Sequence, residues 1–211
     1  MWELVKAGGW LMLPLLLCSV FMIAISIERF IRLKRQLIVP NALLMTTGQN
    51  NTHAVLEQMD QNPQLQQTSL GRIFLVGGQN RQQGQQYTRA QMEAVASREI
   101  GHLEKNINFL GTLSAVAPLL GLLGTVLGII ESFLVIDIAT SNPTLMIPGI
   151  SKALITTAAG MFIAVPALFA YRYFQRLVQE YIAELEQQAT LFHAALFYTD
   201  TNDKAVLDQA S

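Results

Sequence analysis

Few residues of this chain could carry chemistry inside its long uncharged stretches, and the candidates among them are three threonines. Thr125, Thr156 and Thr157 all lie in such stretches. A hydroxyl group donates one hydrogen bond and accepts others, so it can exchange a proton or solvate an ion without adding a fixed charge. The structural alternative is a hydrogen bond from each hydroxyl back to a carbonyl of its own helix.

A lysine and a glutamate stand at the edges of the same stretches. Lys152 precedes the uncharged residues 153–171, and Glu131 follows the uncharged residues 106–130. A lysine near the centre of a membrane helix costs about 2.5–3.5 kcal/mol on insertion. Lys152 could extend to the outer interface, pair with an acid of a partner or neighbouring subunit, or carry a proton itself. Glu131 could be a solvated interfacial carboxylate or could concentrate cations at a channel mouth.

No motif of an enzyme active site accompanies these residues. The chain has no Gly-x4-Gly-Lys-Ser/Thr, Gly-x-Ser-x-Gly or His-Glu-x-x-His motif. His53, His102 and His193 lack metal-ligand spacing, and Cys18 is the single cysteine. The sequence therefore predicts a protein that is not an enzyme and that has no cofactor and no metal site.

The composition indicates a membrane protein. Charged residues make up 14% of the chain, against about 25% in a soluble domain, and hydrophobic residues make up 51%. Residues 7–27, 106–130 and 153–171 contain no Asp, Glu, Lys or Arg. Each stretch has about 19 to 25 residues, enough to cross a hydrocarbon core of about 30 Å as a helix. We therefore expect an all-α membrane protein with three long transmembrane helices, and the net charge of −1 disfavours a nucleic-acid partner.

The charges beside the apolar stretches predict the orientation. Residues 29–35 are strongly basic, and by the positive-inside rule this flank is cytoplasmic, which places the N-terminus outside and the C-terminus inside. Residues 131–149 contain acids and no Lys or Arg, as expected for an outer loop. The predicted segments are an outer segment at 1–9, transmembrane helices at 10–30, 106–133 and 149–174, a Gln-rich cytoplasmic loop with helices at 31–105, an outer loop at 134–148, and a cytoplasmic helix and tail at 175–211.

Helical spacing of apolar residues predicts further helices on the cytoplasmic side. Residues 89–110 form one such pattern, so we expect a helix with Thr88 as its N-cap that continues into the second transmembrane helix. Asn62-Pro63 and Gly77-Gly78 predict helix breaks. The apolar stripe after residue 174 predicts that the third transmembrane helix extends well beyond the membrane.

Small residues form a stripe along the second and third transmembrane helices, whereas the first is rich in Leu and Met and is expected to face lipid. The stripe on the second helix alternates spacings of 3 and 4 and comprises Gly111, Ser114, Pro118, Gly121, Thr125, Gly128 and Ser132. The stripe on the third comprises Gly149, Ala153, Thr156, Gly160, Ala164, Ala167 and Tyr171, with Thr157 beside it. Such stripes let helices pack closely in lipid, and they could also line a narrow polar pathway. Pro118 and Pro166 could kink their helices.

Two segments resemble signatures of the MotA/TolQ/ExbB proton channel family. Residues 117–130, Ala-Pro-Leu-Leu-Gly-Leu-Leu-Gly-Thr-Val-Leu-Gly-Ile-Ile, are similar to its second-crossing signature. Residues 149–160, Gly-Ile-Ser-Lys-Ala-Leu-Ile-Thr-Thr-Ala-Ala-Gly, followed by Val165-Pro166-Ala167, are similar to its third. The expected three crossings and C-terminal helix resemble the ExbB/TolQ branch, since the MotA branch has four crossings.

The resemblance implies a pore-forming stator subunit of a proton-driven motor in the inner membrane of a Gram-negative bacterium. A pentameric ring embedded in lipid would enclose the single membrane helices of two ExbD- or TolR-like subunits, each with a proton-carrying Asp. Low dielectric raises the pKa of such a carboxyl group. Proton flow would drive a TonB- or TolA-like transducer that acts on the outer membrane. The resemblance assigns Thr125 and Thr157 to the pore, and we expect Thr156 to belong to the same proton pathway. The resemblance also implies that Pro118 and Pro166 shape the pore helices.

One position departs from the family pattern. Relatives often carry Glu in Gly-Ile-x-Glu-Ala-Leu, where this chain has Lys152, and a lysine cannot act as the same acid. The functional alternative to the motor is a non-conducting structural scaffold of the same fold. An intramembrane enzyme or transporter has less support, because the sequence has neither paired acids nor a repeated half. The choices between ExbB-like and TolQ-like duty, and between protons and sodium, stay open.

Overall fold

The computed structural model of this chain describes residues 8–45, 52–134 and 143–208, and within these ranges its regular elements are helices. Most of the predicted outer segment 1–9, the middle of the predicted outer loop 134–148 and the last three residues lie outside the described residues. The chain divides into two compact units. We call Met1–Arg29 with Asn106–Gln175 the membrane unit, and Phe30–Lys105 with Arg176–Ser211 the peripheral unit.

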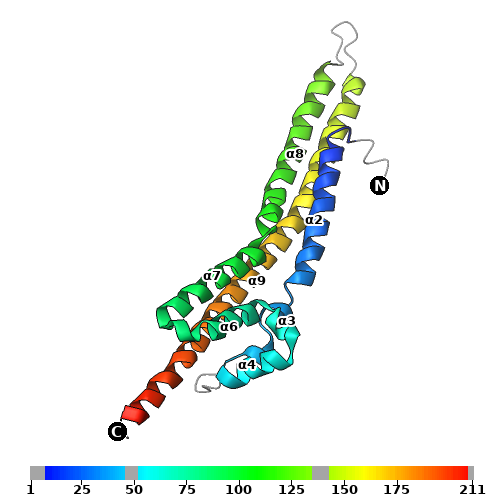
Figure 1. The fold of residues 1–211 in the computed structure, drawn as a ribbon. Helices are drawn as coiled ribbons and strands as arrows, with labels where there is room; N and C mark the ends of the chain where they lie inside the picture. The colour runs from blue at the N-terminus through cyan, green and yellow to red at the C-terminus, as the bar shows by residue number, and fades with distance from the viewer. Residues whose placement is uncertain (1–7, 46–51, 135–142, 209–211) are drawn as a thin grey trace. The chain divides into compact units, whose positions relative to one another are not determined.

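Three helices carry the membrane unit: α2 (Met12–Arg32), α8 (Ile107–Leu134) and α9 (Ile147–Asp208), the last preceded by the short helix η3 (Pro143–Met146) (Figure 1). Within the described residues, three helical stretches are long and apolar enough to cross a membrane, as predicted. A helix suits this setting because it satisfies its backbone hydrogen bonds internally, where lipid offers no partner. The predicted extension of the third helix is confirmed, since α9 continues without a break to Asp208.

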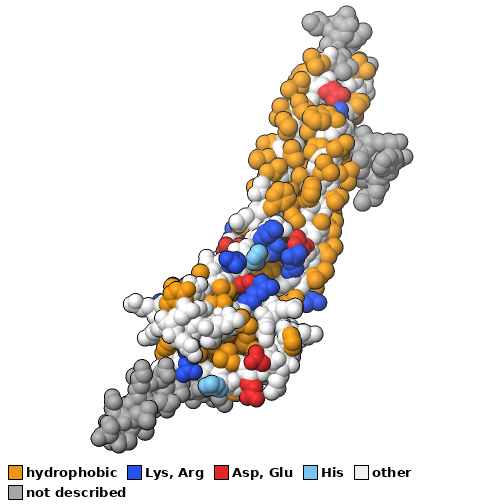
Figure 2. Space-filling model, in the orientation of Figure 1, with side chains coloured by type: hydrophobic (Ala, Val, Ile, Leu, Met, Phe, Trp, Pro, Cys, Tyr) orange, Lys and Arg blue, Asp and Glu red, His pale blue; other side chains and the backbone are white. Residues whose placement is uncertain are grey.

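One face of α2 packs against α8 and α9, and the rest of its surface is apolar and exposed. Met12 and Leu15 contact a core that includes Ala117 of α8 and Ala164 of α9. Phe21 meets Phe109 edge to face, with ring centroids 6.2 Å apart. Apolar side chains cover much of the visible surface of the membrane helices (Figure 2). This arrangement supports the expectation that α2 contacts lipid.

The peripheral unit consists of one long helix, several shorter ones and the later part of α9. Its elements are α3 (Arg35–Ile38), η1 (Asn41–Leu43), α4 (Thr52–Gln61), α5 (Pro63–Gln66), α6 (Ser69–Gln79), η2 (Arg81–Gln83) and α7 (Gln85–Glu104). Phe74 of α6 stacks on Phe192 of α9, with ring centroids 4.1 Å apart. The buried carboxylate of Glu99 accepts hydrogen bonds from Ser69 and Arg72, both 2.9 Å away, and so ties α7 to α6.

Of the two predicted breaks in this unit, one is confirmed and one is wrong. Asn62 separates α4 from α5, and its side chain accepts a hydrogen bond from the backbone N–H of Gln64. Gly77 and Gly78 instead lie inside α6. A Cβ atom on Gly77 would stand 2.9 Å from Sδ of Met92, so this glycine permits close packing rather than ending the helix.

The predicted N-cap of α7 is also wrong. The helix begins at Gln85 after Gly84, which has φ +100° and so occupies a conformation that favours glycine. Thr88 lies one turn inside the helix, where its hydroxyl donates to the carbonyls of Asn80 and Gly84 at 2.8 and 3.0 Å. Thr88 therefore joins α7 to the preceding turn.

The helix predicted to continue from residue 89 into the second transmembrane segment is divided in two. α7 ends at Glu104 and α8 begins at Ile107, with Asn106 between them at φ +63°. Asparagine tolerates this left-handed conformation better than most residues. The side-chain amide of Asn106 donates to Oε2 of Glu28 at 3.0 Å, which ties the start of α8 to α2.

Candidate functional site

Glycine residues bring α8 and α9 into backbone contact. A Cβ atom on Gly160 would lie 2.7 Å from the carbonyl oxygen of Ala117, and one on Gly128 would lie 2.7 Å from Cβ of Ala153. A Cβ on Gly121 would lie 3.1 Å from Cα of Thr157. The three glycines that the sequence proposes as a packing seam, Gly121, Gly128 and Gly160, are thus all buried at the helix crossing.

The buried stripe of α8 differs slightly from the stripe of small residues in its sequence. The buried positions on this part of the helix are Ala117, Gly121, Gly124, Gly128 and Ser132. Pro118 and Thr125 each follow one of these positions and are half-buried. The two stripes share Gly121, Gly128 and Ser132 and differ by one residue at the other two positions.

The three candidate hydroxyls have different surroundings. Thr125 donates from Oγ1 to the carbonyl of Leu122 at 2.6 Å, within its own helix. Thr157 donates across the crossing to the carbonyl of Gly121 at 2.9 Å. Both residues are half-buried, and both hydroxyl oxygens can still accept a hydrogen bond.

Thr156 is enclosed within the subunit. It is 1% exposed, and its hydroxyl donates to the carbonyl of Lys152 at 2.6 Å and lies 3.3 Å from the carbonyl oxygen of Gly8. Its methyl group packs on Gly124, where a Cβ atom would stand 2.5 Å away. Thr156 therefore links α9 to α8 and to the segment before α2.

The two prolines lie inside continuous helices. Pro118 is in α8 and Pro166 is in α9, and neither residue ends its helix. Each lacks the N–H group that would bond to the carbonyl one turn earlier. Pro118 is half-buried beside the crossing and Pro166 is exposed, so Pro118 is the one that lies next to the packed interface.

Lys152 pairs with Glu131 of the same chain. Its Nζ atom lies 2.6 Å from Oε2 of Glu131, which joins the second turn of α9 to the last turn of α8. The two side chains are 31% and 57% exposed. The sequence did not predict this partner. The ion pair expected from the sequence was with an acid of a partner or neighbouring subunit. The signal that could have found it is two opposite charges near the adjacent ends of consecutive antiparallel helices.

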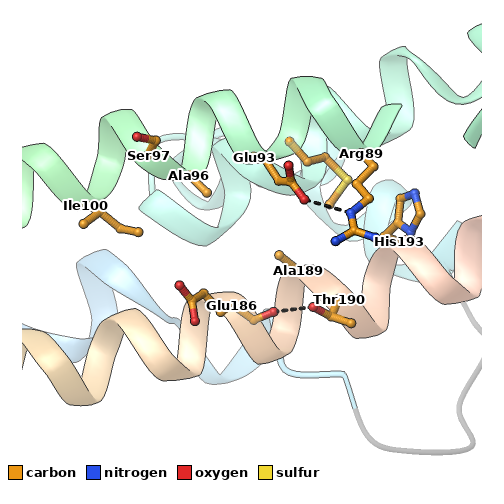
Figure 3. Close-up of a pocket in the computed structure, with 10 residues that line it drawn as sticks. Arg89, Glu93, Ala96, Ser97, Ile100, Glu186, Ala189, Thr190 and His193 are labelled. Carbon is orange, nitrogen blue, oxygen red and sulfur yellow. Dashed lines mark hydrogen bonds and ion pairs between the residues drawn. The ribbon is translucent and has the colours of Figure 1, made fainter. Parts of the chain in front are cut away.

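A cavity lies beside this ion pair. Its volume is about 350 Å³, and its lining includes Trp10 and Leu11 just before α2, Gly128 of α8, and Lys152 and Thr156 of α9. A second cavity, of about 540 Å³, lies in the peripheral unit between α7 and α9 (Figure 3). Arg89 there pairs with Glu93 at 2.8 Å, and the candidate residues from the sequence lie elsewhere.

Comparison with known proteins gives consistent matches. The family model described as the MotA/TolQ/ExbB proton channel family matches residues 65–187. A protein of Synechocystis sp. named as an ExbB-like biopolymer transport protein is 31% identical over 198 residues, which cover 90% of this chain and 78% of the relative.

Two further relatives match over shorter stretches. The Tol-Pal system protein TolQ of Haemophilus influenzae is 37% identical over 115 residues, covering 52% of this chain and 50% of the relative. The biopolymer transport protein ExbB of Salmonella typhimurium is 38% identical over 85 residues, covering 40% of this chain and 35% of the relative. The chain thus matches about half or less of the length of these two relatives.

Proposed function

Since this chain belongs to the MotA/TolQ/ExbB proton channel family, in its ExbB/TolQ branch, we propose that it is the pore-forming subunit of an inner-membrane motor driven by the proton gradient. In this proposal five copies form a ring, oriented with the N-terminus outside and the C-terminus inside. The pore holds the membrane helices of an ExbD- or TolR-like dimer. The complex energises a TonB- or TolA-like transducer that acts on the outer membrane.

The observation that carries the proposal is the pair of half-buried hydroxyls beside the glycine crossing. Thr157 bonds to the carbonyl of Gly121, and Thr125 follows Gly121 by one turn of α8, which is about 5.4 Å along the axis. The two hydroxyls therefore lie within about one turn of each other along the helix. Thr125 makes the bond within its own helix that the structural alternative predicts, so the proposal depends on the acceptor capacity that both hydroxyl oxygens keep.

The membrane unit supplies hydroxyls at this depth but no carboxylate. Residues 106–130 and 153–171 contain no charged side chain. A proton carrier must therefore come from another chain or from water. An Asp on a partner helix would fit, because a neighbouring hydroxyl can donate to its ionised form and accept from its protonated form. Thr156, which is buried within the subunit, would support this pathway by holding α9 against α8.

The alternative function is a non-conducting scaffold with the same packing. Replacing Thr125 and Thr157 together by valine keeps the side-chain shape and removes both hydroxyls, so it separates the two functions. We expect the double variant to express and assemble but to lose function driven by the proton gradient, in cells that lack the native copy. Full activity of the double variant would favour the scaffold. Co-purification of a small partner with a single Asp-containing membrane helix would support the motor independently.

A further inference from the structure

Three segments of the membrane unit meet around one lysine. The ammonium group of Lys152 bonds to the carboxylate of Glu131 on α8 at 2.6 Å. The aliphatic part of Lys152 lies on Gly9, which has φ +72° and where a Cβ atom would clash with Cε of the lysine. One turn further along α9, Thr156 bonds to the backbone of Lys152 and approaches that of Gly8. Lys152 thus contacts both α8 and the segment that precedes α2.

The glycine crossing by itself restrains the distance between the axes of α8 and α9. It restrains the rotation of each helix about its own axis less well. Side chains that interlock as ridges and grooves are what normally set the angle and rotation of packed helices. At this crossing the facing positions are mostly Gly and Ala, as at Gly121, Gly128 and Ala153, so the ridges are low. Besides the side chains of α9 that enter glycine gaps of α8, such as Thr156 at Gly124, a contact displaced sideways from the crossing restrains the rotation of α9 about its own axis.

The hydrogen bond of Thr157 is sensitive to such a rotation. Its donor and acceptor atoms are 2.9 Å apart. A rotation of α9 by about 20° would move an atom about 4–5 Å from the helix axis by about 1.5 Å, given the dimensions of an α-helix. Directed away from the carbonyl, a displacement of that size lengthens the 2.9 Å contact to about 4.4 Å, which is beyond hydrogen-bonding distance.

We propose that Glu131 and Lys152 are a positioning pair, which holds the rotation of α9 so that Thr157 stays at the carbonyl of Gly121. This inference rests on the proposed function, because it gives the pair a role in keeping a pathway hydroxyl in place. Ser132, the residue next to Glu131, adds a second restraint at the same end, since its hydroxyl bonds to the carbonyls of Gly128 and Met146 at 2.8 and 3.2 Å. The pair acts through Thr157 and itself conducts nothing.

Charge exchange tests the pair directly. The variants are Glu131→Lys, Lys152→Glu and the combination of both, which restores opposite charges at the same two positions. We expect each single variant to lower proton-driven function about fivefold or more, because it places like charges face to face. The combined variant should recover to within about twofold of the original chain, which is the behaviour of residues that are energetically coupled. Function is measured in cells lacking the native copy, and the complex is quantified from the same membranes.

A matched control comes from the same helix. Arg176 and Glu180 form an exposed pair at 2.9 Å with side chains 83% and 57% exposed, and such surface pairs contribute little. Glu180→Lys should leave proton-driven function unchanged. Single Glu131 and Lys152 variants that behave like this control, or a combined variant as impaired as the worse single one, would overturn the proposal.

Thermal unfolding of the purified complex separates positioning from simple stabilisation. Loss and recovery of function with little change in Tm across the set supports positioning. Loss of function that follows loss of Tm in every variant contradicts it. Failure of the proposed function looks different, because then the unmodified chain supports no proton-driven process, or the double Thr→Val variant keeps full activity.

Discussion

The hydroxyl of Thr157 donates a hydrogen bond to the backbone carbonyl of Gly121, 2.9 Å away on the neighbouring helix. The bond is possible because Gly121 has no side chain. A Cβ atom on Gly121 would lie only 3.1 Å from Cα of Thr157 and would push the two helices apart. The same contact therefore packs two helices and leaves the oxygen of the hydroxyl able to accept a further hydrogen bond. Structural and conducting roles for Thr157 must be separated by experiment.

Single substitutions of Thr157 should distinguish these roles. Thr157→Ser keeps the hydroxyl and should retain most proton-driven function, whereas Thr157→Val should lower it about tenfold. A hydrogen bond worth about 1.4 kcal/mol in the transition state corresponds to that factor. The measurement is proton-driven function relative to the amount of assembled complex.

The matched control for this substitution is Thr112→Val. Thr112 is an exposed residue of α8 whose hydroxyl donates to the carbonyl of Asn108 at 3.0 Å, so it shares the residue type and the local bonding without the crossing. We expect it to leave function unchanged. Full function of Thr157→Val together with a loss in Thr157→Ser would point to packing as the main role of Thr157, because valine keeps the side-chain shape and serine does not.

Enlarging a glycine at the crossing should separate the helices. Gly160→Leu would place side-chain atoms where a Cβ alone already stands 2.7 Å from the carbonyl oxygen of Ala117 and 3.0 Å from Cα of Gly121. Backbone atoms cannot move aside as a flexible side chain does, so we expect the free energy of unfolding to fall by about 2 kcal/mol or more. Thermal unfolding in detergent measures this, with Ala158→Leu on the exposed face of α9 as the control. Equal Tm values for the two variants would contradict the tight crossing.

The spans and the family were accessible from the sequence because both rest on features that are local along the chain. A run without charges, such as residues 106–130, predicts a membrane helix whatever surrounds it. The glycines of the crossing were accessible for the same reason, since their spacing places them on one face. The predicted orientation, ring and partners depend on the membrane and on other chains, and they stay predictions.

The features that the sequence did not provide depend on contacts between distant segments. Gly77 suggested a helix break, yet it allows α6 to approach Met92 and Phe192, which no local pattern reveals. The break at Asn106 falls within a regular apolar pattern and depends on one backbone angle. The pairing of Lys152 with Glu131 depends on how two helices are rotated against each other, a quantity that the spacing along each helix does not contain.

Removing the buried carboxylate of Glu99 should destabilise the peripheral unit. Glu99 is 6% exposed, and its two oxygens accept hydrogen bonds from Ser69 and Arg72. Glu99→Ala leaves the buried hydroxyl of Ser69 without this acceptor, and we expect the free energy of unfolding to fall by about 1–3 kcal/mol. Glu93→Ala removes one partner of the exposed pair with Arg89 and should change stability by about 0.5 kcal/mol or less. Thermal unfolding of the purified chain compares the two, and a Glu93 effect as large as the Glu99 effect would contradict the assignment.

Substitutions at Asn106 should separate its backbone role from its side-chain role. Asn106→Gly keeps the positive φ of +63° accessible and removes only the hydrogen bond to Glu28, whereas Asn106→Ala loses both. A left-handed conformation costs a residue such as alanine about 1–2 kcal/mol, so the alanine variant should be the less stable of the two by about 1 kcal/mol. Glu28→Ala should destabilise the protein more than Asn106→Gly, because it also removes the carboxylate 3.8 Å from the buried guanidinium of Arg29. Thermal unfolding in detergent measures the order, with Lys105→Ala as the control at the adjacent exposed residue. If Asn106→Ala were as stable as Asn106→Gly, α7 and α8 would have to join through a right-handed residue, and the division between these helices would be refuted.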